Sequence, residues 1–470
     1  MSVLIKGGRI VTAADDYVGD VFVDGERISL IGESLDVQAD KVIDASGKYV
    51  LPGAVDPHTH LDMPFGGTVT IDDFESGQTA AAFGGTTTHV DFCIQGHGQT
   101  FAEALEGWHA KREGKQVIDC GFHIAVTDLE EGGSLEELAS LPEQGITSYK
   151  LFMAYKGVLQ VSDETLFKTM EVAAETGALV MVHAENGDAI DVLVKQALAN
   201  GNTEPRWHAL TRPPELEGEA THRAIQLARI AGAPLYVVHV TCKEAVDAID
   251  RARRSGWRVW GETCTQYFFV NLAHMSQPGF EGAKYVFSPP VRDPSNHDVL
   301  WDAVRTDVLS AISTDHCAFT YGEQKALGKD DFSKIPNGAP GLEERLKLIH
   351  HFGVREGRIT VNRMVELLCT NPARLFGLDP QKGTLAVGSD ADIVVFDPEK
   401  PATLNASTQH SRSDYNLYEG TEDVGDVETV LLRGNVLVES GELVAKPGVG
   451  RFVKRAKFGE ELRTGAAATA

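Results

Sequence analysis

The chain has 470 residues, with 43 Lys or Arg against 68 Asp or Glu, which gives a formal net charge of −25 at pH 7. This charge disfavours binding to nucleic acids or to anionic membranes, because both need a cationic protein face. The length exceeds one ordinary domain and predicts a large domain with a smaller module. MSVLIKGGRIV does not resemble a secretory signal and no apolar stretch is long enough to cross a bilayer, so we expect a cytoplasmic protein.

Short strands separated by turns are predicted in residues 1–52 and again in residues 376–445. Both segments are rich in β-branched residues and have Gly or Asp-Gly at the breaks, as in DYVGDVFVDGERISLIG and VETVLLRGNVLVESGELV. Neither segment has enough strands to bury a core of its own, so we expect one composite β-sandwich domain built from both. Two separate small β units are the alternative.

Apolar strand-like runs alternate with helical patterns in residues 53–375. There are eight such runs: GAVDPHTHL, GTTTHVDFC, VIDCGFHIAV, ITSYKLFMA, ALVMVHAE, PLYVVHVT, WRVWGETC and VLSAISTD. Helix candidates lie between them, and the one over residues 242–256 ends at Gly256, as a helix with a glycine C-cap should. Eight strands alternating with helices predict an α/β fold, a (β/α)8 TIM-like barrel that forms the catalytic domain. A doubly wound open sheet is the rival.

Two further features bear on the environment of the chain. Residues 446–470 turn from basic to small and featureless, which is typical of a C-terminal arm or a frayed terminus. The cysteines form no CxxC pair, so in a chain of this size we expect them to be reduced and buried. They are Cys93, Cys120, Cys242, Cys264, Cys317 and Cys369.

Polar residues at the ends of the apolar runs suggest a metal site. His58 and His60 are two residues apart, so on a strand their imidazoles point to the same face, although the HxH pattern alone is weak. His183, His239 and Asp315 each end another apolar run. In a (β/α)8 barrel the carboxyl ends of all strands meet at one mouth, where active sites lie. We therefore expect these five side chains to converge.

The number of these ligands favours two metal ions over one. A catalytic mononuclear zinc site usually has three protein ligands, whereas four imidazoles and a carboxylate fit a pair of Zn, Mn or Co ions. Two metals also need a bridging anion, and no spare carboxylate stands out at a strand end. His89 and His123 lie in strand-like runs with apolar residues after them, so we interpret both as structural.

Six motifs, in order along the chain, closely resemble the dihydropyrimidinases and the related bacterial hydantoinases, cyclic amidases of the amidohydrolase superfamily. They are GAVDPHTHLDMPFGG, ITSYKLFMAYKG, HAEN, VVHVT, STDHCAF and GTLAVGSDADIVVFDP. The resemblance runs from the first residues to about residue 450. It implies metal-dependent hydrolysis of the ring amide of cyclic ureides, with two divalent ions, Zn foremost, in a homotetramer.

The resemblance also assigns residues. It implies that Lys150 is carbamylated and bridges the two metals, and that His58 and His60 hold the more buried one. A lysine in a barrel mouth is desolvated, which favours the neutral amine that reacts with CO2. Tyr155 corresponds to an oxyanion donor, and Ser288 and Asn337 to positions whose backbone groups hold the substrate. Asp315 would carry the proton from the attacking water to the leaving nitrogen.

The choice among relatives depends on a few positions. Dihydroorotase-like members usually have an Arg where this chain has Asp62, so an anionic substrate is disfavoured. Allantoinase fits the DMPFGGT segment less well, and a non-catalytic scaffold of the same fold would lack the metal ligands that are present here. The sequence does not separate dihydropyrimidines from hydantoins. The loops that would shape the pocket for the exocyclic substituent include Met63, Phe65, Phe152 and Leu159.

Overall fold

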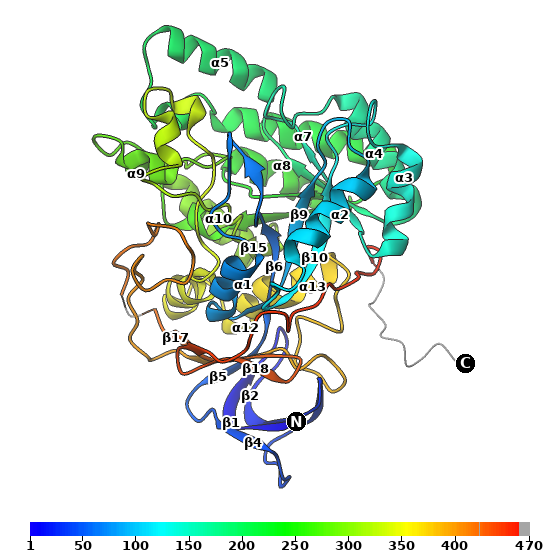
Figure 1. Ribbon diagram of the computed structural model, residues 1–470, viewed down its shortest axis with the longest axis vertical. Helices are drawn as coiled ribbons and strands as arrows, with labels where there is room; N and C mark the ends of the chain where they lie inside the picture. The colour runs from blue at the N-terminus through cyan, green and yellow to red at the C-terminus, as the bar shows by residue number, and fades with distance from the viewer. Residues whose placement is uncertain (423, 460–470) are drawn as a thin grey trace.

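A closed parallel barrel forms the centre of the molecule in the computed structural model, which describes residues 1–422 and 424–459 (Figure 1). Its strands follow one another around the barrel in chain order. They are β6 (Ala54–Thr59), β9 (Thr86–Ile94), β10 (Asp119–Ala125), β11 (Ser148–Phe152), β12 (Leu179–His183), β13 (Leu235–Val237), β14 (Val259–Cys264) and β15 (Ala311–Ser313). A parallel bridge from Thr59 to His316 joins the last strand to the first. The barrel prediction is therefore confirmed, and the open sheet was the wrong alternative.

Helices surround the barrel and cover its strands. Their bounds are α1 (Phe74–Phe83), α2 (Phe101–Arg112), α3 (Leu135–Ser140), α4 (Asp163–Thr176), α5 (Gly187–Ala199), α6 (Trp207–Leu210), α7 (Pro214–Ala231), α8 (Lys243–Arg254), α9 (Leu272–Met275), α10 (Ser295–Arg305), α11 (Arg345–Leu348), α12 (Val361–Val365) and α13 (Asn371–Leu375). The sequence explains where they end. Ser162 caps the start of α4, and Gly177, with φ of 79°, ends it. Gly256 follows α8 with φ of 74°, a left-handed conformation that suits glycine.

Shorter helical turns connect these elements. They are η1 (Leu141–Gln144), η2 (Thr265–Phe268), η3 (Glu281–Tyr285), η4 (Lys325–Gly328), η5 (Phe332–Lys334), η6 (Ile349–Arg355) and η7 (Glu366–Thr370). A small hairpin of β7 (Pro64–Phe65) and β8 (Thr68–Val69) follows the first barrel strand. This hairpin and η4 both lie in loops that follow barrel strands, on the side where the strands end.

Both chain segments that were predicted to be β-rich contribute to one nine-stranded sheet. Its strands are β1 (Ser2–Val11), β2 (Asp16–Asp24), β3 (Arg27–Gly32), β4 (Lys41–Asp44), β5 (Tyr49–Pro52), β16 (Ile393–Asp397), β17 (Asp426–Leu432), β18 (Asn435–Glu439) and β19 (Glu442–Leu443). The antiparallel pairing of β5 with β16 joins the two segments. One apolar core draws on both, from Val3 and Val21 to Val395 and Leu431. The two separate small β units are therefore excluded.

A buried ion cluster joins this sheet to the barrel. The ammonium of Lys382 lies 2.6 Å from Asp119, 2.9 Å from Asp390 and 2.8 Å from Asp392. Asp119 is the first residue of barrel strand β10 and also contacts Arg433, the residue after β17. Lys382, Arg433 and the three carboxylates around Lys382 are buried, so each charge depends on its partners.

Two segments outside the regular elements also pack on the barrel. Ser411 donates 2.5 Å to Asp72 and Asn416 donates 2.6 Å to Glu344, so part of the range 376–445 lies against the barrel. The predicted C-terminal arm begins with an ordered strap over residues 446–459. There Val453 bonds to Cys120, and the buried Arg455 donates 2.8 Å to Ser148. Residues 460–470 of that arm lie outside the described residues.

All six cysteines are free and buried, as the sequence predicts. In the described ranges 1–422 and 424–459, no helix combines the length and the apolar character needed to cross a bilayer.

Candidate active site and metal centre

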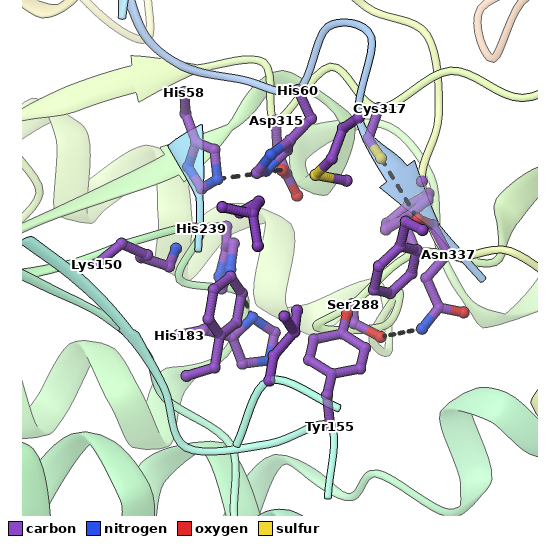
Figure 2. A pocket seen from close by; sticks show the side chains of 17 residues that line it. His58, His60, Lys150, Tyr155, His183, His239, Ser288, Asp315, Cys317 and Asn337 are labelled. Atoms are coloured by element: carbon purple, nitrogen blue, oxygen red, sulfur yellow. Dashed lines mark hydrogen bonds and ion pairs between the residues drawn. The ribbon is translucent and has the colours of Figure 1, made fainter. Parts of the chain in front are cut away.

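One cavity at the carboxyl ends of the barrel strands brings together every site residue that the sequence predicts (Figure 2). These lining residues are His58, His60, Met63, Phe65, Lys150, Phe152, Tyr155, Leu159, His183, His239, Ser288, Asp315 and Asn337. The cavity is also lined by Ile94, Phe287, Cys317 and Gly338, which the sequence reasoning did not single out. They carry no signal in a single sequence, because an apolar residue, a cysteine or a glycine in a loop is most often structural.

His58, His60 and Asp315 form a compact ligand set on one wall of the cavity. The Nε2 atoms of His58 and His60 each lie 3.1 Å from the same carboxylate oxygen of Asp315. The three ligand atoms offered by these buried residues lie within 4.8 Å of one another. Within the described residues, Nδ1 of His60 and Nδ1 of His239 are buried and have no hydrogen-bond partner. A buried ring nitrogen without a donor or acceptor is costly, and a metal cation would satisfy it.

His183 and His239 form a second set beside the first. Nδ1 of His183 lies 2.9 Å from Nε2 of His239, and the His239 ring centroid is 5.3 Å from that of His58. The other nitrogen of His183, Nε2, lies 2.9 Å from Glu185. A carboxylate on the outer nitrogen orients an imidazole towards a metal. The two sets together therefore offer nitrogen and oxygen donors for two adjacent cations.

Lys150 lies in the same cavity between these sets (Figure 2). It is 1% exposed, and its Nζ is 4.8 Å from the ring centroid of Phe92 and 5.1 Å from that of Phe152. In the described part of the chain it forms no ion pair with a carboxylate. Burial lowers the pKa of Lys150 to about 7, so a large fraction of the side chain is a neutral amine near neutral pH.

Glu262 is a buried carboxylate of β14 that the sequence reasoning missed. One of its oxygens contacts Nδ1 of His58, and the other accepts a hydrogen bond of 2.9 Å from Tyr236. The signal in the sequence was a glutamate inside the apolar run WRVWGETC, where an unpaired charge would be costly. Glu262 therefore fixes the ring of His58 and leaves its Nε2 facing Asp315.

The backbone is strained at three of the predicted site residues. Tyr155, His239 and Asp315 have φ values of 69°, 41° and 49°, a left-handed region that residues other than glycine rarely adopt. Strain of this kind costs on the order of 1–3 kcal/mol per residue and concentrates at functional sites. Burial opposes ionisation of Asp315, but the adjacent His58 and His60 outweigh it and hold the pKa of Asp315 well below its usual value.

Tyr155, Ser288 and Asn337 lie on the opposite side of the cavity (Figure 2). The amide of Asn337 donates 3.2 Å to the hydroxyl of Ser288, which lies 3.1 Å from His208 Nε2. The ring of Tyr155 meets that of Phe65 edge to face at 5.4 Å. Burial raises the pKa of Tyr155, so its phenol keeps its proton and remains a hydrogen-bond donor at neutral pH.

Three residues that the sequence places outside the metal site lie outside the cavity. Asp62 is 3.8 Å from Lys115 and does not line the cavity, so this position offers no cation to a substrate. His89 is hydrogen-bonded at both nitrogens, to Thr59 and Gln78. His123 likewise contacts Ser148 and the carbonyl of Pro57 at 2.9 Å. Both histidines are thus buried and fully paired, in keeping with a structural role.

Comparisons with known proteins agree with this geometry. The model of the amidohydrolase family matches residues 49–437. A D-hydantoinase from Geobacillus stearothermophilus is 53% identical over 460 residues, covering 98% of both chains. A D-hydantoinase from Streptomyces coelicolor is 51% identical, covering 96% of this chain and 98% of the relative. The crystal structure of dihydropyrimidinase from Brevibacillus agri superposes with a TM-score of 0.96 at 54% identity, covering 98% of this chain and all of that one. The chain therefore belongs to the amidohydrolase family, in its D-hydantoinase and dihydropyrimidinase branch.

Proposed function

We propose that this chain hydrolyses the ring amide of neutral cyclic ureides, 5,6-dihydropyrimidines such as dihydrouracil and 5-monosubstituted hydantoins, to N-carbamoyl amino acids. The observation that carries the proposal is the convergence of His58, His60, His183, His239 and Asp315 with a buried, unpaired Lys150 in one cavity. The close relatives bear the names of enzymes of this reaction class. A scaffold without catalysis would have no need for this buried polar set.

Two divalent metal ions fit the donors, and Zn is the ion we propose. His58 and His60 would hold one ion, His183 and His239 the other, with Asp315 as an additional ligand. Lys150, as its carbamate, would supply the anion that the two sets otherwise lack. When bound, the metals would supply Lewis acidity that lowers the pKa of the attacking water and polarises the substrate carbonyl.

The protein's own groups then carry the proton and the charge. Tyr155 donates a hydrogen bond to the carbonyl oxygen as negative charge develops on it. Asp315 accepts the proton from the attacking water and delivers it to the ring nitrogen as the carbon–nitrogen bond breaks. Addition of one water thus leaves a carboxylate on the former carbonyl carbon and a free carbamoyl nitrogen. Ser288 and Asn337 hold the rest of the ring in register.

The lining of the cavity supports an uncharged ring with an apolar substituent. Met63, Phe65, Phe152 and Leu159 present apolar surface to the cavity, and the residue at position 62 is an aspartate, which does not line the cavity. A carboxylate on the ring substituent would lose its hydration against these apolar side chains without a compensating charge.

A panel of rings tests the proposal. We expect purified, metal-loaded protein to open dihydrouracil, hydantoin and 5-phenylhydantoin, and to leave dihydroorotate and allantoin nearly untouched. Replacement of Asp315 by Asn should lower turnover by a factor of about 100 or more, compared with wild type at equal metal content. Turnover of none of the three neutral rings, or near wild-type turnover by Asp315→Asn, would refute the proposal. Preferential opening of allantoin would reassign the substrate.

The resemblance to the hydantoinases also supports a cytoplasmic homotetramer. The mass of the particle in solution, measured by light scattering at several concentrations, tests the assembly, and a stable monomer would contradict it.

A further inference from the structure

A buried lysine that the proposed reaction does not use lies against two loops of the catalytic cavity. Lys325, the first residue of η4, has no solvent exposure. Its Nζ donates three hydrogen bonds of 2.7 Å each, to the backbone carbonyls of Val286, Pro336 and Gly338. It forms no ion pair with a carboxylate in the ranges that the structure describes. Burial lowers the pKa of Lys325 to about 7, and the three carbonyls are the groups that stabilise its charged ammonium form.

These carbonyls bracket two residues that line the cavity. Val286 lies two residues before Ser288, and Pro336 and Gly338 flank Asn337. The two loops are also bonded to each other directly, since Gly338 N donates 3.0 Å to the Val286 carbonyl. The side chain of Asn337 donates to Ser288 across the same junction. Lys325 thus joins both loops from the side away from the cavity, which it does not line.

The bonds of Lys325 fix the direction of the peptide groups of Asn337. In a planar trans peptide the C=O and N–H point in opposite directions. The Pro336 carbonyl faces Lys325, so the N–H of Asn337 points away from the ammonium. The N–H of Gly338 faces Val286, so the carbonyl of Asn337 points away from that residue. The N–H of Asn337 therefore points away from Lys325, and its carbonyl points away from Val286.

We propose that Lys325 is a positioning residue, which locks residues 286–288 and 336–338 into one rigid edge and so aims the backbone groups of Asn337 at the ring amide of the substrate. The inference rests on the proposed function, because it assigns these backbone groups to the substrate. A lysine suits the task because its ammonium has three donors and no acceptor, which matches three carbonyls. The ring of Phe319, 5.8 Å from Nζ, adds a favourable contact.

Gly338 shows how tightly this edge is built. Its φ is 148°, and a Cβ at this position would collide with the carbonyl oxygen of Cys317. The sulfur of Cys317 in turn lies 3.6 Å from the carbonyl of Asn337. The two loops are thus contacted by Lys325 on one side and by Cys317 on the other. Removal of the ammonium leaves the carbonyls of Pro336 and Gly338 without the donor that Lys325 supplies, and leaves the Val286 carbonyl with the Gly338 N–H alone.

The test compares Lys325→Met with Lys329→Met. Methionine nearly matches the volume of lysine but removes all three donors, and Lys329 is an exposed lysine four residues later, so it serves as the matched control. In Lys325→Met we expect the KM for dihydrouracil to rise by about tenfold or more while kcat falls much less, with two metals per chain retained. Lys329→Met should behave as wild type. Lys325→Gln, which keeps two N–H donors on a shorter side chain, should show a smaller KM increase.

Hydrogen–deuterium exchange gives a second readout that does not depend on turnover. In Lys325→Met, the amides of residues 286–291 and 336–340 should exchange faster than in wild type, with exchange in residues 54–62 unchanged. A lower melting temperature with unchanged KM and unchanged exchange would show a merely structural role and overturn the proposal. If Lys325→Met does not fold, Lys325→Gln is judged by the same criteria. If wild-type protein opens no ring, the proposed function has failed, whereas the exchange measurement still decides whether Lys325 clamps the loops.

Discussion

Glu262 accepts a hydrogen bond of 2.9 Å from the hydroxyl of Tyr236 at one carboxylate oxygen and contacts the imidazole of His58 at the other. All three side chains are buried. The carboxylate therefore fixes both the orientation and the tautomer of a histidine in the proposed metal site, while Tyr236 fixes the carboxylate.

Replacement of Glu262 by Gln should weaken metal binding. Loss of such a partner typically costs about 10–100-fold in metal affinity or activity. Competition with a chelator, followed by metal analysis of the protein, measures the change. Tyr236→Phe is the milder control, because it removes one hydrogen bond and leaves the carboxylate in place. Equal metal retention in wild type and Glu262→Gln would show that Glu262 does not support His58.

The barrel strands were predictable from the sequence, whereas the candidate site was predictable only in part. The eight apolar runs each contain one barrel strand, because a parallel strand is buried on both faces and reads as a continuous apolar segment. The strand ends then placed His183, His239 and Asp315 at one rim. Glu262 was harder to find, since its role depends on the contact with His58, 204 positions away in the chain. Lys325 was also missed, because its partners are backbone carbonyls, which leave no trace in a sequence.

The C-terminal strap illustrates the limit of composition. The composition after position 446 suggested an arm or a frayed terminus, yet Arg455 is 3% exposed and bonds to Ser148, the first residue of β11, and to Phe122 within β10. Only the position of the carbonyl and hydroxyl acceptors inside the barrel end makes burial of this guanidinium possible.

Leu159 should control the size of the accepted substituent. It lines the catalytic cavity beside Phe152 and is smaller than an aromatic side chain. In Leu159→Trp we expect kcat/KM for 5-phenylhydantoin to fall by about tenfold or more, because overfilling a packed apolar pocket costs about 1–3 kcal/mol. The kcat/KM for dihydrouracil, which has no substituent on its ring, should change by less than about threefold. An equal loss for both rings would place Leu159 outside the substituent pocket.

Lys382 should be essential for the attachment of the β-sheet to the barrel. Replacement by Met leaves Asp119, Asp390 and Asp392 buried with one cation fewer. Breaking a buried ion cluster in this way costs about 3–5 kcal/mol. The midpoint of urea unfolding should therefore fall clearly. Lys41→Met is the matched control, since Lys41 and its partner Glu439 are partly exposed and such pairs contribute about 0–1 kcal/mol. Similar midpoints for the two variants would contradict a structural role for the cluster.

Asp72 should make folding stability depend on pH. Burial opposes its ionisation, but His316, Arg412 N and Ser411 outweigh burial and lower the pKa of Asp72 to about 2. Because the folded-state pKa lies below the unfolded value, the stabilisation is present above about pH 4 and disappears as the pH falls towards 2. Asp72→Asn should therefore lose about 2 kcal/mol at pH 7. The difference from wild type should shrink in unfolding measurements at pH 3, and an equal difference at both pH values would exclude this linkage.

The most direct test of a two-metal cyclic amidase is the metal content and the turnover of dihydrouracil, measured on the same preparations of wild type and Lys150→Met. In the proposed function, Lys150 is the buried amine that becomes the anion shared by the two ligand sets. We expect about two metals per wild-type chain, and in Lys150→Met a loss of at least one metal with turnover reduced by about a thousandfold or more. Wild-type turnover by Lys150→Met with two metals still bound would contradict the account.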